Sequence, residues 1–277
     1  MKLTTQSAKV ISTGESNYNE MCKIIELAGR TCYKSLDKIT ANSALEFVER
    51  MKKSKHYSTL EHGTMYLYFE VPEDNQIIKF FKQNKYSVVK IKEDIAFITT
   101  NYRVIVENFD EDEQKKLVDR MQPYSSEFEK RTTVVMTTNL QIAAEYCRHR
   151  KFSFNQESTR YCNYSKGKFN NELTFVDPRS AFTKFYYNEN GCFTVWMQTN
   201  QVIEDNYLSL ASKGCIAQEC AQILPKDLKT ELVMTGTTTD WNHFMDLRYY
   251  GKTGAPHPQA KELATKIMDA MKLYGRE

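Results

Sequence analysis

The sequence predicts an α+β domain in which a central mixed or antiparallel sheet is flanked by helices. Two observations predict this class. Short segments rich in β-branched and aromatic residues are interspersed with longer segments of helical periodicity. The chain of 277 residues, 41% of them hydrophobic and 26% charged, can bury a substantial core, and it contains no repeat, low-complexity tract or Pro/Gly-rich linker. We therefore expect a single domain over residues 1–277.

The N-terminal part of the chain is predicted to contain two strands and two helices. Residues 8–12 and 65–71 have the branched and aromatic composition of strands. Between them, residues 17–31 and 41–55 place apolar side chains at helical spacing, and Ser16 is suited to cap the first helix. A strand and two helices are thus expected before the second strand.

The remaining elements follow from the same periodicities. Helices are expected at 74–85 and 110–121, the latter starting with acids that complement the helix dipole, and one or two strands at 96–105. Further strands are expected at 132–138, 172–177 and 230–234, and further helices at 140–147, 193–212, 216–224, 241–248 and 258–273. Asn139 is suited to cap the helix at 140–147, and residues 237–240 offer caps for the helix at 241–248.

The most polar candidate for a functional site is the segment 148–161, RHRKFSFNQESTRY. It fits neither strand nor helix periodicity, and it lacks the Gly, Pro and Asp that are typical of turns. Its arginines match phosphate and carboxylate oxygens in pairs, while Ser, Asn and Gln add neutral hydrogen bonds. The segment follows a predicted helix, so Arg148, His149 and Arg150 would place three cations at its carbonyl end, aimed out of the core. This pattern indicates a polyanion or nucleotide site, and the alternative is an exposed polar segment.

Charge and composition narrow the classes of function. The net charge of +3 does not call for nucleic acid or an anionic membrane as a partner, and no apolar run reaches the ~20 residues of a membrane span. Without a signal pattern, a soluble cytoplasmic protein is expected. The seven scattered cysteines indicate reduced, structural thiols, and Cys147 and Cys162 are weak candidates for a nucleophile. His56 and His62 lack a third ligand of metal-site spacing, so hydrogen-bonding histidines without a metal are expected.

The polar segment carries a resemblance to a known family. Its pattern R-H-R-x-x-S-x-N-x-x-S-x-R-Y closely resembles the signature of the flavin-dependent thymidylate synthases. The segment His56–His62 is similar to the H-x-(S/T)-x-x-E-H motif of that family, and residues 223–225, 241–248 and 257–259 are similar to its later motifs, in the family's order. The resemblance implies the family's fold, with residues 73–131 as a probable insertion.

The resemblance also implies roles for individual residues. Arg248 would activate the uracil ring. Flavin contacts would come from His56, Ser58, Glu61, Arg148, His149, Arg150, Asn155, Thr237, Thr238, Thr239 and His243. The deoxyuridylate (dUMP) site would contain Glu145, Tyr146, Cys147, Arg148, Gln156, Glu157, Ser158, Thr159, Arg160 and Arg248.

The activity implied is the reductive methylation of dUMP to dTMP. Methylenetetrahydrofolate would donate the carbon, FAD reduced by NADPH would carry the hydride, and a homotetramer would build each site from several subunits. Ala221 stands where the family commonly has an arginine, which motivates a second hypothesis, a related flavoenzyme that hydroxymethylates or otherwise modifies a pyrimidine nucleotide. A third is a single-stranded nucleic-acid-binding module, although the balanced charge opposes it.

Two ordinary structural roles remain open. Thr237, Thr238 and Thr239 would serve equally well as helix caps, and His243 as a hydrogen-bonded core histidine. Ser158 is the obvious nucleophile of the signature, but no base of triad type lies near it in sequence, so a binding role is favoured.

Overall fold

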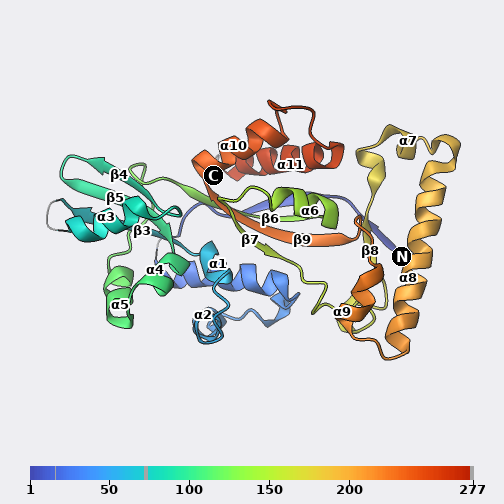
Figure 1. Cartoon of the computed structure of the whole chain (residues 1–277), viewed down its shortest axis with the longest axis horizontal. Helices are drawn as coiled ribbons and strands as arrows, with labels where there is room; N and C mark the ends of the chain where they lie inside the picture. The colour runs from blue at the N-terminus through green and yellow to red at the C-terminus, as the bar shows by residue number, and fades with distance from the viewer. Residues whose placement is uncertain (16, 72–73, 275–277) are drawn as a thin grey trace.

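The computed structural model describes residues 1–15, 17–71 and 74–274, and it confirms an α+β architecture with antiparallel sheets (Figure 1). The central sheet has the strand order β2-β6-β9-β7, and every neighbouring pair is antiparallel. Its strands are β2 (Ser7–Ser12), β6 (Arg131–Asn139), β9 (Lys229–Thr237) and β7 (Ser153–Gln156). β6 and β9 pair along their whole length, and the site described below is built on them.

Helices cover both faces of this sheet. Leu232 and Met234 of β9 point into a core shared with α6 (Leu140–Tyr146), α10 (Thr238–Arg248) and α11 (Pro258–Tyr274). Successive side chains of a strand point to opposite faces. The intervening residues of β9 therefore face α1 (Tyr18–Cys32), which packs against β7 and β9 from the other side (Figure 1).

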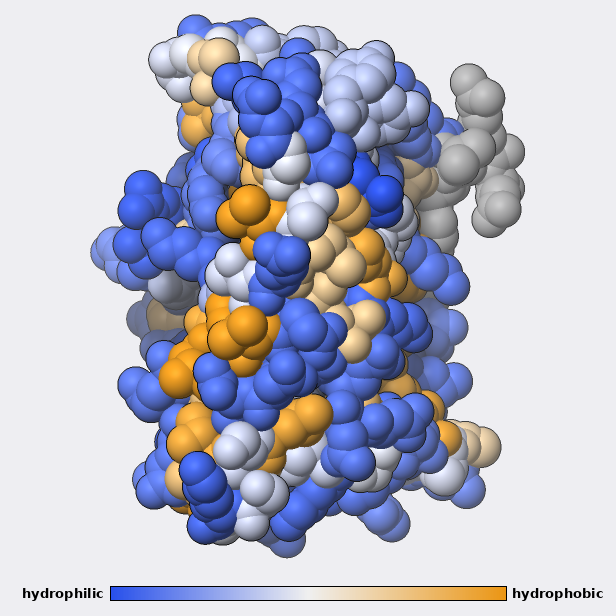
Figure 2. Space-filling model, turned by 90° about the vertical axis from the view of Figure 1, so that its right-hand side faces the viewer, coloured by the Kyte–Doolittle hydropathy of each residue, from blue (hydrophilic) through white to orange (hydrophobic). Residues whose placement is uncertain are grey.

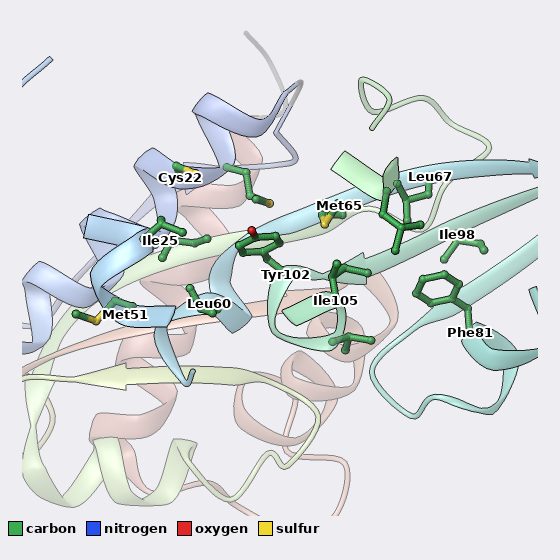
Figure 3. Close-up of a cluster of buried hydrophobic side chains, with 14 of the residues drawn as sticks. Cys22, Ile25, Met51, Leu60, Met65, Leu67, Phe81, Ile98, Tyr102 and Ile105 are labelled. Atoms are coloured by element: carbon green, nitrogen blue, oxygen red, sulfur yellow. The ribbon is translucent and has the colours of Figure 1, made fainter. Parts of the chain in front are cut away.

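A second sheet lies at the end of the molecule where α3, α4 and α5 gather (Figure 1). Its order is β3-β5-β4, from Thr64–Glu70, Ile95–Asn101 and Val88–Lys92. The accompanying helices are α2 (Ser43–Lys53), α3 (Asn75–Gln83), α4 (Tyr102–Asn108) and α5 (Glu111–Asp119). Figure 3 shows how side chains from these elements and α1 form one core, with Ile25, Leu60 and Leu67 fully buried.

The opposite end holds a third core. β1 (Lys2–Thr4) pairs in parallel with β8 (Thr174–Val176). The helices there are α7 (Thr183–Tyr186), α8 (Cys192–Ser212) and α9 (Ala217–Cys220). Phe175, Tyr207 and Leu228 are buried between them.

Several predicted elements differ from those observed. The segment 96–105 is a strand only as far as Asn101, whose side chain accepts a hydrogen bond from the Val104 amide and thereby begins α4. β4 was not predicted. The predicted helix at 216–224 is limited to α9 followed by a 3₁₀ turn at Ala221–Ile223. The predicted cap Ser16 lies outside the described residues, and Asn17 caps α1 instead.

The largest correction concerns the signature. The prediction of a wholly irregular segment is wrong, because Ser153–Gln156 forms β7 and pairs with Leu232–Thr235 of β9. The strand period is hidden in the sequence because both faces of β7 lie against protein, so polar and apolar residues do not alternate cleanly.

The cysteine thiols are free and partly or fully buried. Burial raises the pKa of Cys162 to about 11 and also raises the pKa of Cys147, which opposes a nucleophilic role for either thiol. No helix in the described ranges combines the length and apolar character of a membrane crossing. Those ranges also contain no group of three or more His, Cys, Asp or Glu side chains that could hold a metal ion.

Candidate active site

Two strand-to-helix junctions position the candidate site. The Asn139 side chain accepts a hydrogen bond from the Ile142 amide at 2.9 Å and starts α6 at the end of β6. The Thr237 hydroxyl accepts from the Asp240 amide at 3.1 Å and starts α10 at the end of β9. β6 and β9 are antiparallel, so the two helices return over the same face of the sheet from opposite ends. Their C-termini meet, and the basic residues that follow α6 lie near Arg248, the last residue of α10.

The guanidinium group of Arg248 is held by three hydrogen bonds. Its Nη1 donates to Glu145 Oε2 at 2.9 Å, and its Nη2 donates to the Glu145 carbonyl oxygen at 2.9 Å. Its Nε donates to His149 Nε2 at 3.1 Å. A guanidinium carries five N–H donors, so two remain for a ligand. Charge-assisted bonds to both the side chain and the backbone of Glu145 fix the plane of the group.

His149 accepts from Arg248 and is therefore an acceptor at Nε2. Burial lowers the pKa of His149 to about 4, and Arg248 and His243 add to the effect. The expectation of three cations after α6 is wrong in this respect, because His149 is neutral near pH 7 while Arg148 and Arg150 are charged and exposed. The imidazole packs on Phe244, with ring centroids 4.9 Å apart. The hydrogen bond from Arg248 and the contact with Phe244 therefore hold His149 in place as a neutral imidazole.

A cavity of 380 Å³ opens between these groups. Its lining includes four cationic side chains, from Arg148, Arg150, Lys151 and Arg248. Phe152 and Leu247 supply apolar wall, and His149, His243 and Asp240 complete the lining. Clustered positive charge beside an apolar wall is suited to a planar ligand that carries negative charge.

The alternation of β7 divides the rest of the signature. Ser153, Asn155 and Glu157 lie on the side of α1, whereas Gln156 lies on the other side and donates to Thr230 Oγ1 at 3.4 Å. Asn155 is buried, and its Nδ2 has no hydrogen-bond partner within the described residues. Glu157 is also buried and accepts from Lys229 Nζ at 2.8 Å. The predicted substrate residues thus do not all reach the Arg248 cavity within one chain.

The end of the signature contacts other elements. The Ser158 amide donates to the Cys32 carbonyl at 2.9 Å, which ties this segment to the end of α1. Arg160 is exposed, donates to Gln218 Oε1 at 3.2 Å, and lies over the Tyr161 ring. These residues do not line the cavity of Arg248.

The other predicted flavin contacts are also distributed. Thr237 caps α10, and the Thr239 amide and hydroxyl donate to Glu129, so the capping alternative describes their contacts in this structure. His243 is exposed and lines the Arg248 cavity, so the core-histidine alternative is wrong.

The histidine motif lies elsewhere. His56 and Ser58 are exposed, and Glu61 accepts from Arg103 Nη1 at 2.6 Å. His56 lines a separate cavity of 550 Å³ together with Arg30 and Arg50. His62 is fully buried and its Nδ1 lies 2.8 Å from Thr235 Oγ1.

The sequence did not point to several residues around these sites. Lys151 and Asp240 line the Arg248 cavity, and Lys34 and Lys229 contact Glu157. Lys151 belongs to the polar segment and could have been included on charge alone. Lys34 and Lys229 carry no local signal, since Lys229 reaches Glu157 through the pairing of β7 with β9 and Lys34 reaches it from the end of α1.

A comparison with known families now identifies the chain. The model of the thymidylate synthase complementing protein family matches residues 72–273, which is more than half of the sequence. The chain belongs to this family. The match also runs through residues 73–131, so the prediction that they form an insertion remains a prediction.

Individual relatives carry related names. A probable flavin-dependent thymidylate synthase of Paramecium bursaria Chlorella virus 1 is 30% identical over 129 residues, 45% of this chain and 60% of the relative. The flavin-dependent thymidylate synthase of Synechocystis sp. is 32% identical over 144 residues, 49% of this chain and 64% of the relative. The chain thus spans less than two thirds of these curated relatives.

A solved structure shows a weaker likeness. The UMP/dUMP methylase PolB from Streptomyces cacaoi, bound with 5-Br dUMP, has a TM-score of 0.47 and 15% identity, with 99% of this chain and 93% of that chain covered.

Proposed function

We propose that this protein is a flavin-dependent thymidylate synthase that converts dUMP to dTMP. The observation that carries the proposal is the convergence of Arg148, His149, Arg150 and Arg248 on one cavity. These residues come from two distant segments that both resemble motifs of the family. Family membership and the names of the relatives support the same activity.

The residues around the cavity fit a flavin. Arg148, Arg150 and Lys151 provide positive charge for a diphosphate or for a reduced, anionic ring, and Phe152 and Leu247 provide apolar surface. When bound, the cofactor would supply the hydride that reduces the transferred carbon. We propose FAD as the cofactor, NADPH as its reductant and methylenetetrahydrofolate as the carbon donor, in line with the resemblance of the signature.

Arg248 would stabilise the pyrimidine ring during the reaction. Its two uncommitted N–H groups can donate to a ring carbonyl, where negative charge develops as carbon and hydride add. Glu145 and His149 hold the guanidinium in place before the substrate arrives, so little reorganisation is needed. His149 stays neutral near pH 7 and therefore keeps the lone pair that accepts from Arg248 Nε.

We further propose a homotetramer in which subunits share each site. Two groups of predicted nucleotide residues lie apart in one chain: Glu145, Arg148 and Arg248 at the cavity, and Ser158 with Arg160 beyond β7. Contacts from a second subunit would bring both groups to one nucleotide.

The surface supports such assembly. The end of the molecule that carries α7 and α8 shows orange, hydrophobic side chains among polar ones (Figure 2). Large side chains in or next to α7 and α8 that are more than half exposed include Tyr186, Tyr187, Val195 and Val202. Apolar surface of this kind is typical of an interface between subunits. Light scattering on the purified protein tests the tetramer, and a monomer would contradict it.

The decisive experiment combines a spectrum with an assay. Purified protein should take up FAD, bleach with NADPH, and form dTMP from dUMP and methylenetetrahydrofolate. Arg248→Ala should retain flavin and lose dTMP formation, whereas Lys79→Ala, at an exposed position on α3, should match the unmodified protein. A protein that stays colourless under saturating FAD would contradict the proposal, and mass analysis of the product separates methyl from hydroxymethyl transfer.

A further inference from the structure

A second polar cavity lies on the α1 side of the central sheet. Its volume is 530 Å³, and its lining includes Lys34, Glu157, Tyr164, Lys229 and Glu231. β7 and β9 separate these side chains from the core of α6 and α10, whose C-terminal ends form the Arg248 cavity. The two cavities share no lining residue. This cavity therefore needs an explanation of its own.

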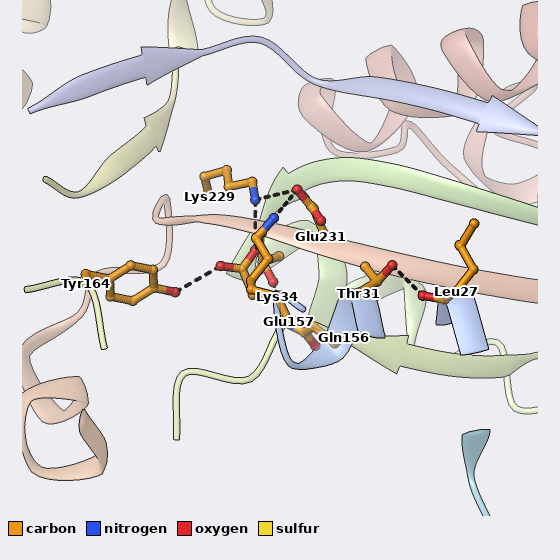
Figure 4. Close-up of polar contacts among 9 residues, drawn as sticks. Leu27, Thr31, Lys34, Gln156, Glu157, Tyr164, Lys229 and Glu231 are labelled. Atoms are coloured by element: carbon orange, nitrogen blue, oxygen red, sulfur yellow. Dashed lines mark hydrogen bonds and ion pairs between the residues drawn. The ribbon is translucent and has the colours of Figure 1, made fainter. Parts of the chain in front are cut away.

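Four charged side chains form one network at its base (Figure 4). Lys229 Nζ donates to Glu157 Oε2 and to Glu231 Oε1, each at 2.8 Å. Lys34 Nζ donates to the same oxygen of Glu231 and lies 3.7 Å from Glu157 Oε2. The Tyr164 hydroxyl donates to Glu157 Oε1 at 3.4 Å. Burying two ion pairs adds little net stability compared with apolar side chains of similar volume, so stability alone does not explain the network.

The end of α1 fixes the backbone of Lys34. Its φ angle of 50° is the left-handed position of a Schellman motif, in which the Ser35 amide donates to the Arg30 carbonyl and the Lys34 amide donates to the Thr31 carbonyl. Burial also lowers the pKa of Lys34, whereas Lys229, which lies between both carboxylates, has its pKa raised by Glu157 and Glu231 despite its burial. Of Lys34 and Lys229, Lys34 is thus the lysine whose positive charge the two carboxylates stabilise less.

Most of the hydrogen-bonding capacity that the described lining residues leave unused consists of N–H donors. An ammonium carries three N–H donors, and within the described chain Lys34 makes one hydrogen bond. Lys2 is exposed at the rim and has no ion pair among the described residues, and Lys168 is 3.6 Å from the exposed Asp37. The side chains of Phe169 and Leu36 add apolar surface to the wall of the cavity.

We infer that this cavity binds a small organic phosphate, with the phosphate held by Lys2, Lys34 and Lys168 and the organic part against Phe169 and Leu36. Three ammonium groups offer more donors than the two oxygens of a carboxylate can accept, and this favours a phosphate. The site shares no lining residue with the Arg248 cavity, and Glu157 is the one predicted substrate residue in its lining.

A ligand bound at this site would affect the position of the signature segment. A phosphate attracts Lys34 away from Glu231, and Glu157 directly precedes Ser158, a predicted substrate residue. The Ser158 amide is also bonded to Cys32 at the end of α1, two residues before Lys34. The ligand is therefore placed to shift the segment that contains Ser158 and Arg160.

Calorimetry on the full chain without flavin or folate tests the site, with phenyl phosphate, inorganic phosphate and benzoate as probes. Phenyl phosphate should bind most tightly, because it satisfies both the lysines and the apolar wall. The double variant Lys2→Met/Lys168→Met changes only exposed side chains and should weaken its binding at least tenfold. Lys34→Met/Glu231→Gln removes one charge of each sign and should do the same. Lys79→Met is the matched control and should bind like the unmodified protein.

Contrary outcomes are equally clear. Unchanged affinity in the Lys2→Met/Lys168→Met protein would overturn the inference, whether or not the buried double variant folds. Loss of binding in Arg248→Ala or Arg160→Met, with the lysine variants unaffected, would assign the phosphate to the proposed active site. A readout without cofactors keeps this result independent of whether the protein makes dTMP.

Discussion

One buried histidine should contribute strongly to the pH dependence of stability. His62 is fully buried at the contact between the two larger sheets, and its Nδ1 lies 2.8 Å from Thr235 Oγ1. Its Nε2 has no hydrogen-bond partner within the described residues. Burial lowers the pKa of His62 to about 3, and the neighbouring Arg131 adds to the effect. The folded protein therefore holds this imidazole neutral.

The sign and size follow from proton linkage. The unfolded chain binds a proton at this histidine below its ordinary pKa of 6.5, while the folded chain does so only near 3. The stabilising contribution is therefore complete above pH 6.5 and is lost as the pH falls towards 3. In this window, each decrease of one pH unit removes about 1.4 kcal/mol from the free energy of unfolding, so about 2 kcal/mol is lost by pH 5.

Urea unfolding at fixed protein concentration, between about pH 7 and pH 5, measures this contribution. His62→Gln cannot titrate, so its stability should fall by about 2 kcal/mol less than that of the unmodified protein over this range. The exposed His56→Gln is the matched control and should keep the full pH dependence. Equal pH slopes for His62→Gln and the unmodified protein would refute the reasoning.

Three further substitutions test the site and its support. Arg248→Lys removes the planar guanidinium whose three nitrogens donate to Glu145 and His149, so dTMP formation in single turnover should fall by a factor of roughly 100 to 1000; near-normal turnover would contradict the role of the guanidinium group. Thr237→Ala removes the cap of α10 and should lower the free energy of unfolding in urea by about 1 kcal/mol, and no loss would mean that the cap is dispensable. Gly236→Ala would place a Cβ 2.4 Å from the Phe152 ring, so thermal unfolding should show a cost of about 1–3 kcal/mol; an unchanged melting temperature would show that the ring moves freely.

Much of the local structure could be predicted from the sequence. The helices at α1, α6, α8 and α11 follow from apolar side chains at helical spacing, and the caps Asn139 and Thr237 follow from side chains that accept amide hydrogens. Family membership was also predictable, because the signature specifies residue types at fixed spacing along one segment. The elements that were missed are short, and their identity depends on partners. β4 exists because β5 pairs with it, and β7 exists because β9 does.

The sequence by itself determined which residue types are available for chemistry, since a motif is a property of consecutive positions. Only the tertiary structure decided where those residues act. Antiparallel pairing of β6 and β9 returns two helices over one face and brings Arg248 to Glu145 and His149, more than ninety positions away. The two-residue period of β7 sends Gln156 and Glu157 to opposite faces, and Glu157 thereby joins Lys34 and Lys229. Neither outcome is encoded locally, because both depend on which strand lies beside which.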